Sequence, residues 1–216
     1  MITLYLVRHG ETTYNREGRI QGHDDAPLTA LGIRQAGAVA DRLSRESIAA
    51  IYSSDLGRAR MTAESIAACH NLPVNATPLL RESNLGVLQG LTRAEIDERY
   101  PASENEWRRD MMTMRPPGAE TIQDVIDRGS EFLRSISGKH EEGESLVIVG
   151  HGGSLRGLVI AACALPSEFY RGLHFANAGL SILNVDAPNR YSIRLLNDTC
   201  HLDSLATDGE EVDSKQ

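Results

Sequence analysis

The segment Leu6-Val7-Arg8-His9-Gly10-Glu11-Thr12 places a cationic and a nucleophilic side chain directly after a short apolar run. That run, Ile2 to Val7, is rich in β-formers and predicts a buried strand. Glycine lets a backbone approach a ligand closely, arginine offers a charged planar fork that suits phosphate, and a neutral imidazole can attack phosphorus. The Arg8 charge also disfavours the imidazolium form of His9. The segment therefore predicts a strand that ends at a phosphate-binding, nucleophilic turn.

Strand and helix patterns alternate along the rest of the chain. Further strands are expected over Ala49 to Ser53, Ser145 to Val149, Leu180 to Val185 and Tyr191 to Leu196. A helix is expected after an N-cap at Thr29, with the buried face Leu31, Ala36, Val39, Ala40 and Leu43. Further helices are expected over Arg58 to Cys69 (Met61, Ser65, Ile66 and Cys69 near one side), over Glu120 to Ser137, and after Gly150-His151-Gly152-Gly153 through Ala164. This alternation predicts an α/β fold, a three-layer α/β/α sandwich with a mostly parallel sheet.

The segment from Ser83 to Gly118 differs from its surroundings because it is polar and ends in Arg115-Pro116-Pro117-Gly118. We interpret residues 83–118 as short helices and loops inserted over the sheet. Residues 1–202 are then expected to form a single domain. Residues 203–216 carry five acidic side chains against one lysine, which predicts a disordered acidic tail.

Composition narrows the class of protein further. A chain of 216 residues with 41% hydrophobic and 24% charged residues can form a globular core without disulfides or metal. The net charge of −8 argues against nucleic acid as a partner. The longest apolar run, Leu158 to Leu165, is too short to cross a membrane, and Arg8 and His9 interrupt any signal peptide, so we expect a cytoplasmic protein. The cysteines, Cys69, Cys163 and Cys200, are expected to be free thiols.

Three predicted strands end in turns that carry charged or imidazole side chains. These turns are Arg8-His9-Gly10, Ser53-Ser54-Asp55, which leads to Arg58, and Gly150-His151-Gly152. Because ligands bind at the carboxyl ends of strands in such sheets, we expect these side chains to meet at one site. The alternatives are structural roles. Arg8 and Arg58 could form ion pairs on the surface, and His151 could be a buried histidine with its hydrogen bonds satisfied in the core.

The motifs together resemble the histidine phosphatase superfamily, which has the phosphoglycerate mutase-like fold. The resemblance follows the family's order and covers nearly the whole chain, up to His201-Leu202. Its pieces are Leu6 to Thr12; Asn15 with Gly18 to Gly22; Leu28-Thr29 with Gly32 and Gln35-Ala36; Ser53 to Ala59; Arg81-Glu82 with Gly86 and Gln89-Gly90; and Val149 to Gly153.

The resemblance implies a role for each site residue. His9 is the expected nucleophile, which forms a phosphohistidine, while Arg8, Arg58 and His151 complete a cationic pocket around the phosphoryl group. Glu82 is expected to protonate the leaving oxygen and later to activate water. The further substrate-binding residues are expected to be Gly10, Thr12, Asn15, Gln21, Arg108, Arg109 and Gly152.

Some assignments remain open in the sequence. Glu11 and Glu120 also lie in loops and compete with Glu82 for the acid role. No metal and no other cofactor is implied, since two arginines and a second histidine supply the positive charge. The remaining histidines, for which we expect no catalytic role, are His23, His70, His140, His174 and His201.

The chain departs from the family pattern at two places. Met61 replaces a common glutamine, which we expect to affect packing and not chemistry. Leu88-Gln89-Gly90 replaces Trp-Glu-Gly, a variant that also occurs in the mutase branch and does not decide the activity.

We expect hydrolysis of a small phosphorylated metabolite without metal, the candidates being phosphoserine, phosphoglycerate-type compounds and sugar phosphates. About thirty residues separate Gly90 from the helix start at Glu120, a shorter cover than mutases carry, which favours entry of water. Trp107-Arg108-Arg109 either resembles the arginines that grip a carboxylate in mutases or forms an exposed amphipathic helix. The alternatives are a cofactor-dependent phosphoglycerate mutase and a non-catalytic phosphate-pocket binding protein. No nucleic-acid or membrane partner is expected, and a homodimer is common in such folds.

Overall fold

The computed structural model describes residues 1–100, 115–187 and 190–206, and within these ranges six strands form one sheet. Its strand order is β3-β2-β4-β1-β5-β6. The strands are β1 (Ile2–Arg8), β2 (Ala50–Ser54), β3 (Val74–Thr77), β4 (Ser145–Gly150), β5 (Leu180–Ala187) and β6 (Arg190–Asp198). Strands β1 to β4 run parallel, whereas β5 and β6 close one edge in antiparallel fashion. The predicted α/β fold with a mostly parallel sheet is confirmed.

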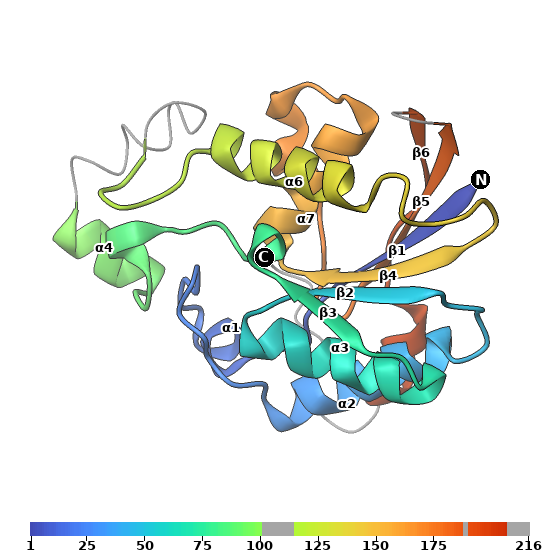
Figure 1. Ribbon diagram of the computed structural model, residues 1–216. Helices are drawn as coiled ribbons and strands as arrows, with labels where there is room; N and C mark the ends of the chain where they lie inside the picture. Colours follow the sequence, from blue (N-terminus) through green and yellow to red (C-terminus); the bar gives the residue numbers. More distant parts are fainter. Residues whose placement is uncertain (101–114, 188–189, 207–216) are drawn as a thin grey trace.

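Four long helices cover the sheet and complete three layers (Figure 1). Helices α2 (Ala30–Leu43) and α3 (Gly57–His70) lie on one face, and α6 (Ile122–Ile136) and α7 (Gly152–Cys163) lie on the other. Side chains of β1 alternate between the two faces, as a strand requires. Leu4 and Leu6 pack under α6 and α7, whereas Tyr5 and Val7 pack under α2 and α3. The central strand is therefore buried on both sides, which fixes the position of the turn at its end.

The buried face of α3 differs from the one predicted. Met61 is 45% exposed and Cys69 is exposed, and Ile66 is the one member of the predicted set that is buried. The helix instead buries small and polar residues: Arg58, Ala59, Thr62, Ala63 and Ala67. The helix thus buries Arg58 together with Ile66, while Met61 and Cys69 face outward.

The inserted segment packs over one end of the sheet as predicted, as far as the structure describes it. It contains the 3₁₀ helix η2 (Gly86–Leu88) and helix α4 (Arg93–Arg99), whose Leu88, Leu91 and Ile96 form a small separate core. Trp107, Arg108 and Arg109 lie outside the described residues. Other short elements are α1 (Thr13–Glu17), η1 (Pro78–Leu80), η3 (Ser167–Arg171) and η4 (Cys200–Leu202).

The boundary predicted for the acidic tail is too early. Residues Asp203–Ala206 form helix α8, and Leu205 packs against the core beneath α2 and α3. The apolar Leu205 anchors this short helix in spite of the acidic residues around it. Residues 207–216 lie outside the described part of the chain. The three cysteines are free, as predicted, and no helix of the described residues is long and apolar enough to cross a membrane.

Candidate active site

Two histidines meet at the carboxyl ends of the central strands. Arg8 pairs with Gly150 in the register of β1 and β4, so the residues that follow, His9 and His151, are neighbours. Their ring centroids are 5.0 Å apart. His9 is 2% exposed and His151 is fully buried. Parallel pairing of two strands therefore produces the histidine pair that the sequence predicted.

The tautomer of His9 follows from its hydrogen bond. Nδ1 of His9 lies 2.7 Å from the carbonyl oxygen of Gly10, which can only accept, so Nδ1 carries the proton. Nε2 is then the nitrogen with a free lone pair. Burial lowers the pKa of His9 well below its usual value, and the charges of Arg58 and Arg8 lower it further. His9 is therefore neutral at neutral pH and has a nucleophilic nitrogen.

Arg58 gives His151 the opposite arrangement. Nε of Arg58 donates to Nδ1 of His151 at 3.2 Å, so Nε2 of His151 carries the proton. Burial, followed by the charge of Arg58, lowers the pKa of His151 well below its usual value, so the ring is neutral as well. The Arg58 guanidinium is 1% exposed and donates to the carbonyl oxygens of Gly22 and Asp24, at 2.7 Å each. Arg58 is thus a fixed cation that orients the second histidine.

Arg8 brings a second buried cation to the same place. Its Nη1 donates to the carbonyl oxygen of Phe175 at 2.6 Å. Burial lowers the pKa of Arg8 to about 10, and the nearby Glu82 carboxylate opposes this shift, so the group stays charged at neutral pH. Within the described residues, Nε of Arg8 and Nε2 of His151 are buried donors without a hydrogen-bond partner. Leaving such a donor unpaired costs about 1–3 kcal/mol, which an anion bound between them would relieve.

The Glu82 side chain contacts the first turn of α7 and lies near Arg8. Its carboxylate accepts from the backbone N–H groups of Ser83 (2.8 Å), Gly153 (3.1 Å) and Ser154 (3.2 Å). A Cβ added at Gly152 would lie 3.8 Å from Cζ of Arg8 and 3.9 Å from Oε2 of Glu82, so these two groups flank that glycine. The helix N-terminus holds the carboxylate by its free N–H groups and its dipole.

The two rival acidic residues have structural partners elsewhere. Glu120 accepts from Nε of Arg128 at 2.7 Å and from the backbone N–H of Asn84 at 2.7 Å. Arg128 in turn donates to the carbonyl oxygens of Leu79, Arg81 and Glu82. Glu11 accepts from the hydroxyl of Thr29 at 2.6 Å, at the start of α2. Of the three acids that the sequence left open, Glu82 is therefore the one placed at the histidine pair.

The predicted substrate-binding residues of the α1 segment form a network. The hydroxyl of Thr12 lies 2.9 Å from Oε1 of Gln21 and 3.0 Å from Oδ1 of Asn15. Oδ1 of Asn15 also accepts from the backbone N–H of Thr12 and from Nδ2 of Asn177. Because these side-chain oxygens are engaged, Asn15 and Gln21 can offer an anion only their amide N–H groups. Gly10 lets the backbone of α2 approach the turn after β1, since a Cβ at Gly10 would collide with the carbonyl oxygen of Gly32.

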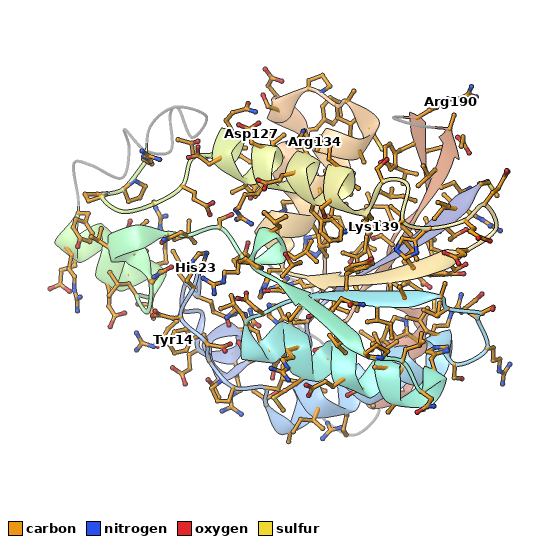
Figure 2. The ribbon with its side chains drawn as sticks, viewed as in Figure 1. Tyr14, His23, Asp127, Arg134, Lys139 and Arg190 are labelled. Atoms are coloured by element: carbon orange, nitrogen blue, oxygen red, sulfur yellow. The ribbon has the colours of Figure 1, made fainter. Side chains whose placement is uncertain are left out.

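Sequence reasoning missed two residues beside the site, Asn177 and His23. Nδ2 of Asn177 donates to the carbonyl oxygen of His9 at 3.1 Å. Nε2 of His23 lies 2.9 Å from the carbonyl oxygen of Glu82 and donates to it. Figure 2 shows His23 and Tyr14 at one end of the molecule and Arg190 at the other. Neither Asn177 nor His23 lies in a recognisable sequence motif, so only the tertiary contacts show that they adjoin the site.

The Leu88-Gln89-Gly90 variant also has a local structural role. Oε1 of Gln89 accepts from the backbone N–H of His23 at 2.7 Å and of Leu85 at 3.3 Å. Gln89 thus ties the loop of His23 to the loop that follows Glu82. Within the described ranges, no group of three or more His, Cys, Asp or Glu side chains is placed to hold a metal ion.

Known proteins show the same architecture over nearly the full chain. GpmB of Yersinia pestis (strain Pestoides F), a probable phosphoglycerate mutase, is 38% identical in an alignment that covers 96% of this chain and 98% of GpmB. The mycobacterial glucosyl-3-phosphoglycerate phosphatase, solved in complex with VO3, is 33% identical with a TM-score of 0.84, over 91% of this chain and 99% of that one. YhfR of Bacillus stearothermophilus is 34% identical with a TM-score of 0.86, over 94% and 100% of the two chains.

The sequence model of the histidine phosphatase superfamily (branch 1) matches residues 4–199. This range includes both histidines, both arginines and Glu82. Relatives in the superfamily are named as phosphatases or mutases, which supports phosphoryl transfer as the class of reaction. The fold, the paired histidines and this match lead to one conclusion: the chain belongs to the histidine phosphatase superfamily, branch 1.

Proposed function

We propose that this protein is a phosphomonoesterase that works through a phosphohistidine at His9 and needs no metal. The observation that carries the proposal is the arrangement around the histidine pair. The Nε2 lone pair of His9 lies beside two buried donors, Nε of Arg8 and Nε2 of His151, that have no hydrogen-bond partner in the described part of the chain. A tetrahedral phosphoryl group, which carries negative charge on its oxygens and an electrophilic phosphorus at its centre, complements this arrangement.

The proposed reaction has two steps. In the first, Nε2 of His9 attacks phosphorus, the ester P–O bond breaks, and Glu82 gives a proton to the leaving alkoxide. In the second, the Glu82 carboxylate takes a proton from water, the water oxygen attacks phosphorus, and the P–N bond to His9 breaks to release inorganic phosphate. Glu82 ends protonated, ready for the next turnover.

Positive charge for the transition state comes from the protein in this proposal. Arg8 and Arg58 are fixed by carbonyl oxygens, and His151 is oriented by Arg58, so none of them has to reorganise. Preorganised donors in a desolvated site each contribute about 3–4 kcal/mol of barrier lowering. The proposed substrate is a phosphorylated metabolite; phosphoserine, phosphoglycerate-type compounds and sugar phosphates are the candidates to test.

The second candidate function is that of a phosphoglycerate mutase, and the 38% identity to GpmB favours it. Two observations favour hydrolysis instead. A solved relative that covers 91% of this chain is named a phosphatase. The segment between Gly90 and α6, which would cover the site, is also short. A mutase must keep water out until the phosphoryl group returns to a second oxygen. A short cover is therefore better suited to a hydrolase.

The decisive test is phosphate release from the candidate phosphomonoesters in EDTA, with His9→Ala as control. We expect release by the wild type, none by the variant, and a phosphoenzyme that acid destroys and base preserves. Phosphorus NMR on 3-phosphoglycerate separates the alternatives, since a mutase yields 2-phosphoglycerate faster than inorganic phosphate. If neither product forms while phosphate still binds, the protein is a non-catalytic phosphate-binding member of the superfamily.

A further inference from the structure

A cavity of about 630 Å³ opens next to Glu82, and neither His9 nor His151 is among its lining residues. Glu82, Ser83 and Gly153 form one end of it. If Glu82 protonates the leaving oxygen, as the proposed function holds, the rest of the alcohol has to lie beyond Glu82. The cavity is therefore the place for the leaving group, and its shape and lining select the substrate.

The walls of this cavity are largely apolar. Leu85 and Leu88 come from the loop around η2, Ile96 comes from α4, and Ile122 and Val125 come from α6. Leu88 and Ile96 also belong to the small separate core that they form with Leu91. The walls are thus built on a packed substructure. Pockets with apolar walls and a few polar groups bind ligands that have an apolar body.

Polar side chains reach the cavity from several elements: Arg156 from α7, Arg93 from α4, Arg171 from η3, and Glu120 and Thr121 from the start of α6. Arg156 follows Gly153 by three residues, so both lie on the same side of the helix. Nε of Arg156 donates to the carbonyl oxygen of Leu173 at 2.8 Å, and the guanidinium lies 5.8 Å from the centre of the Tyr170 ring. These contacts hold the cation against the cavity wall, about one helical turn (roughly 5 Å) from the N–H that binds Glu82. The apolar side chains between these polar groups are left to contact the body of the ligand.

A three-carbon leaving group would fill only part of this cavity. Serine and glycerate each have seven non-hydrogen atoms, which occupy roughly 210 Å³ at the volume of about 30 Å³ that liquid water takes per molecule. That is about one third of the cavity of about 630 Å³. The remaining space next to apolar walls would hold water, which an apolar group displaces at a gain in free energy.

We propose that the preferred substrates are phosphomonoesters of bulky alcohols that carry an apolar ring or chain, and not phosphoserine or phosphoglycerate. This proposal rests on the proposed function. It assigns Leu85, Leu88 and Ile96 as residues that determine specificity.

A series of primary alkyl phosphates tests the proposal, because their leaving groups have similar intrinsic reactivity. Ethyl phosphate, 2-phenylethyl phosphate and phosphoserine are compared by kcat/KM. We expect the value for 2-phenylethyl phosphate to exceed that for each of the other two by at least tenfold, mainly through a lower KM. A ratio near one, or a preference for phosphoserine, overturns the proposal and leaves the phosphatase function standing. Absence of phosphate release from all three contradicts the proposed function itself.

A filled cavity provides the second arm of the experiment. Leu85→Trp is expected to lower the ratio of 2-phenylethyl to ethyl phosphate at least tenfold. The matched control is Val185→Trp, which fills a separate cavity of about 750 Å³ at the far end of β5, lined by Met1, Ile2 and Leu133, and should keep the wild-type ratio. An unchanged ratio in a folded Leu85→Trp protein contradicts the assignment. If that variant does not fold, the wild-type series decides.

Discussion

His23, which belongs to no recognised motif, helps to position Glu82, which does. Its Nε2 donates to the carbonyl oxygen of Glu82, and its backbone N–H donates to Gln89. Nη2 of Arg128 approaches the same Glu82 carbonyl at 3.3 Å. The backbone of the proposed acid is thus held from two sides, by residues that are 59 and 46 positions away in the chain.

The variant His23→Leu removes one of these two supports. A lost hydrogen bond of this kind costs about 0.5–1.5 kcal/mol, so kcat should fall roughly 2- to 10-fold while KM changes little. His23→Gln keeps an N–H donor and should recover most of kcat. Steady-state kinetics on one substrate measure both effects. Equal kcat for the leucine variant and the wild type shows that His23 does not position Glu82.

Arg108 and Arg109 allow a prediction that depends on the resemblance alone, because they lie outside the described residues. If they bind a carboxylate, Arg108→Ala and Arg109→Ala should raise KM for 3-phosphoglycerate several-fold and leave KM for ethyl phosphate as it is. Ethyl phosphate is the control because it has no second anionic group. Unchanged kinetics on both substrates indicates that these arginines form part of an exposed surface.

At the scale of elements, the N-terminus of α7 joins the second histidine to the proposed acid. His151 is the N-cap of the helix, and Gly153 and Ser154 donate their backbone N–H groups to Glu82. A Cβ at Gly153 would collide with Oε1 of Glu82 and would lie 2.6 Å from Oγ of Ser83. Glycine at this position therefore serves the contact with Glu82 and not the stability of the helix.

The variant Gly153→Ala should separate activity from stability. The added methyl group displaces Glu82, and we expect kcat/KM to fall at least tenfold, because a misplaced catalytic group loses its effective concentration. Gly37→Ala in α2 is the control, since its Cβ would meet no atom within 4 Å. That control should keep full activity and gain about 0.5–1 kcal/mol in the free energy of unfolding. Full activity of Gly153→Ala would exclude the proposed position of Glu82.

At the scale of the whole molecule, burying two neutral histidines couples the site to stability. Burial lowers the pKa of both His9 and His151 well below the usual value of 6.5, so below that pH the unfolded chain binds protons that the folded chain does not. The free energy of unfolding therefore falls as pH decreases from about 6.5 towards the folded-state pKa values, by up to about 1.4 kcal/mol per pH unit for each group. This contribution of the two histidines to the free energy of unfolding is fully present above pH 6.5.

Urea unfolding between pH 8 and pH 5 measures this dependence. We expect the wild type to lose stability steadily below pH 6.5, and His9→Asn to lose it less steeply because one titrating group has been removed. The variant's midpoint at pH 8 serves as its own reference. Identical slopes for the two proteins would indicate that His9 is not buried as a neutral ring.

Local sequence patterns were sufficient to predict most helices and strands. They did not predict which face of α3 is buried, and they missed strand β3. The apolar run of β1 and the amphipathic pattern of α2 and α6 are visible in single segments. Strand β3, Val74–Thr77, has one strongly apolar residue and lies at the sheet edge, so its pairing with β2 provides the information that its composition lacks. The buried face of α3 could not be predicted for a related reason, since the chain buries Arg58 there while Met61 stays exposed.

The sequence by itself determined the superfamily, the mostly parallel sheet and the convergence of His9, Arg8, Arg58 and His151. The superfamily followed from the resemblance of the ordered motifs. The convergence followed because turns at the carboxyl ends of parallel strands meet at one edge of the sheet, whatever the details of packing. Only the tertiary structure decided the tautomers of the two histidines, the position of Glu82 beside Arg8 and the start of α7, and the cavity next to Glu82. These features depend on hydrogen bonds and contacts between segments far apart in the chain, and no local pattern encodes such distances.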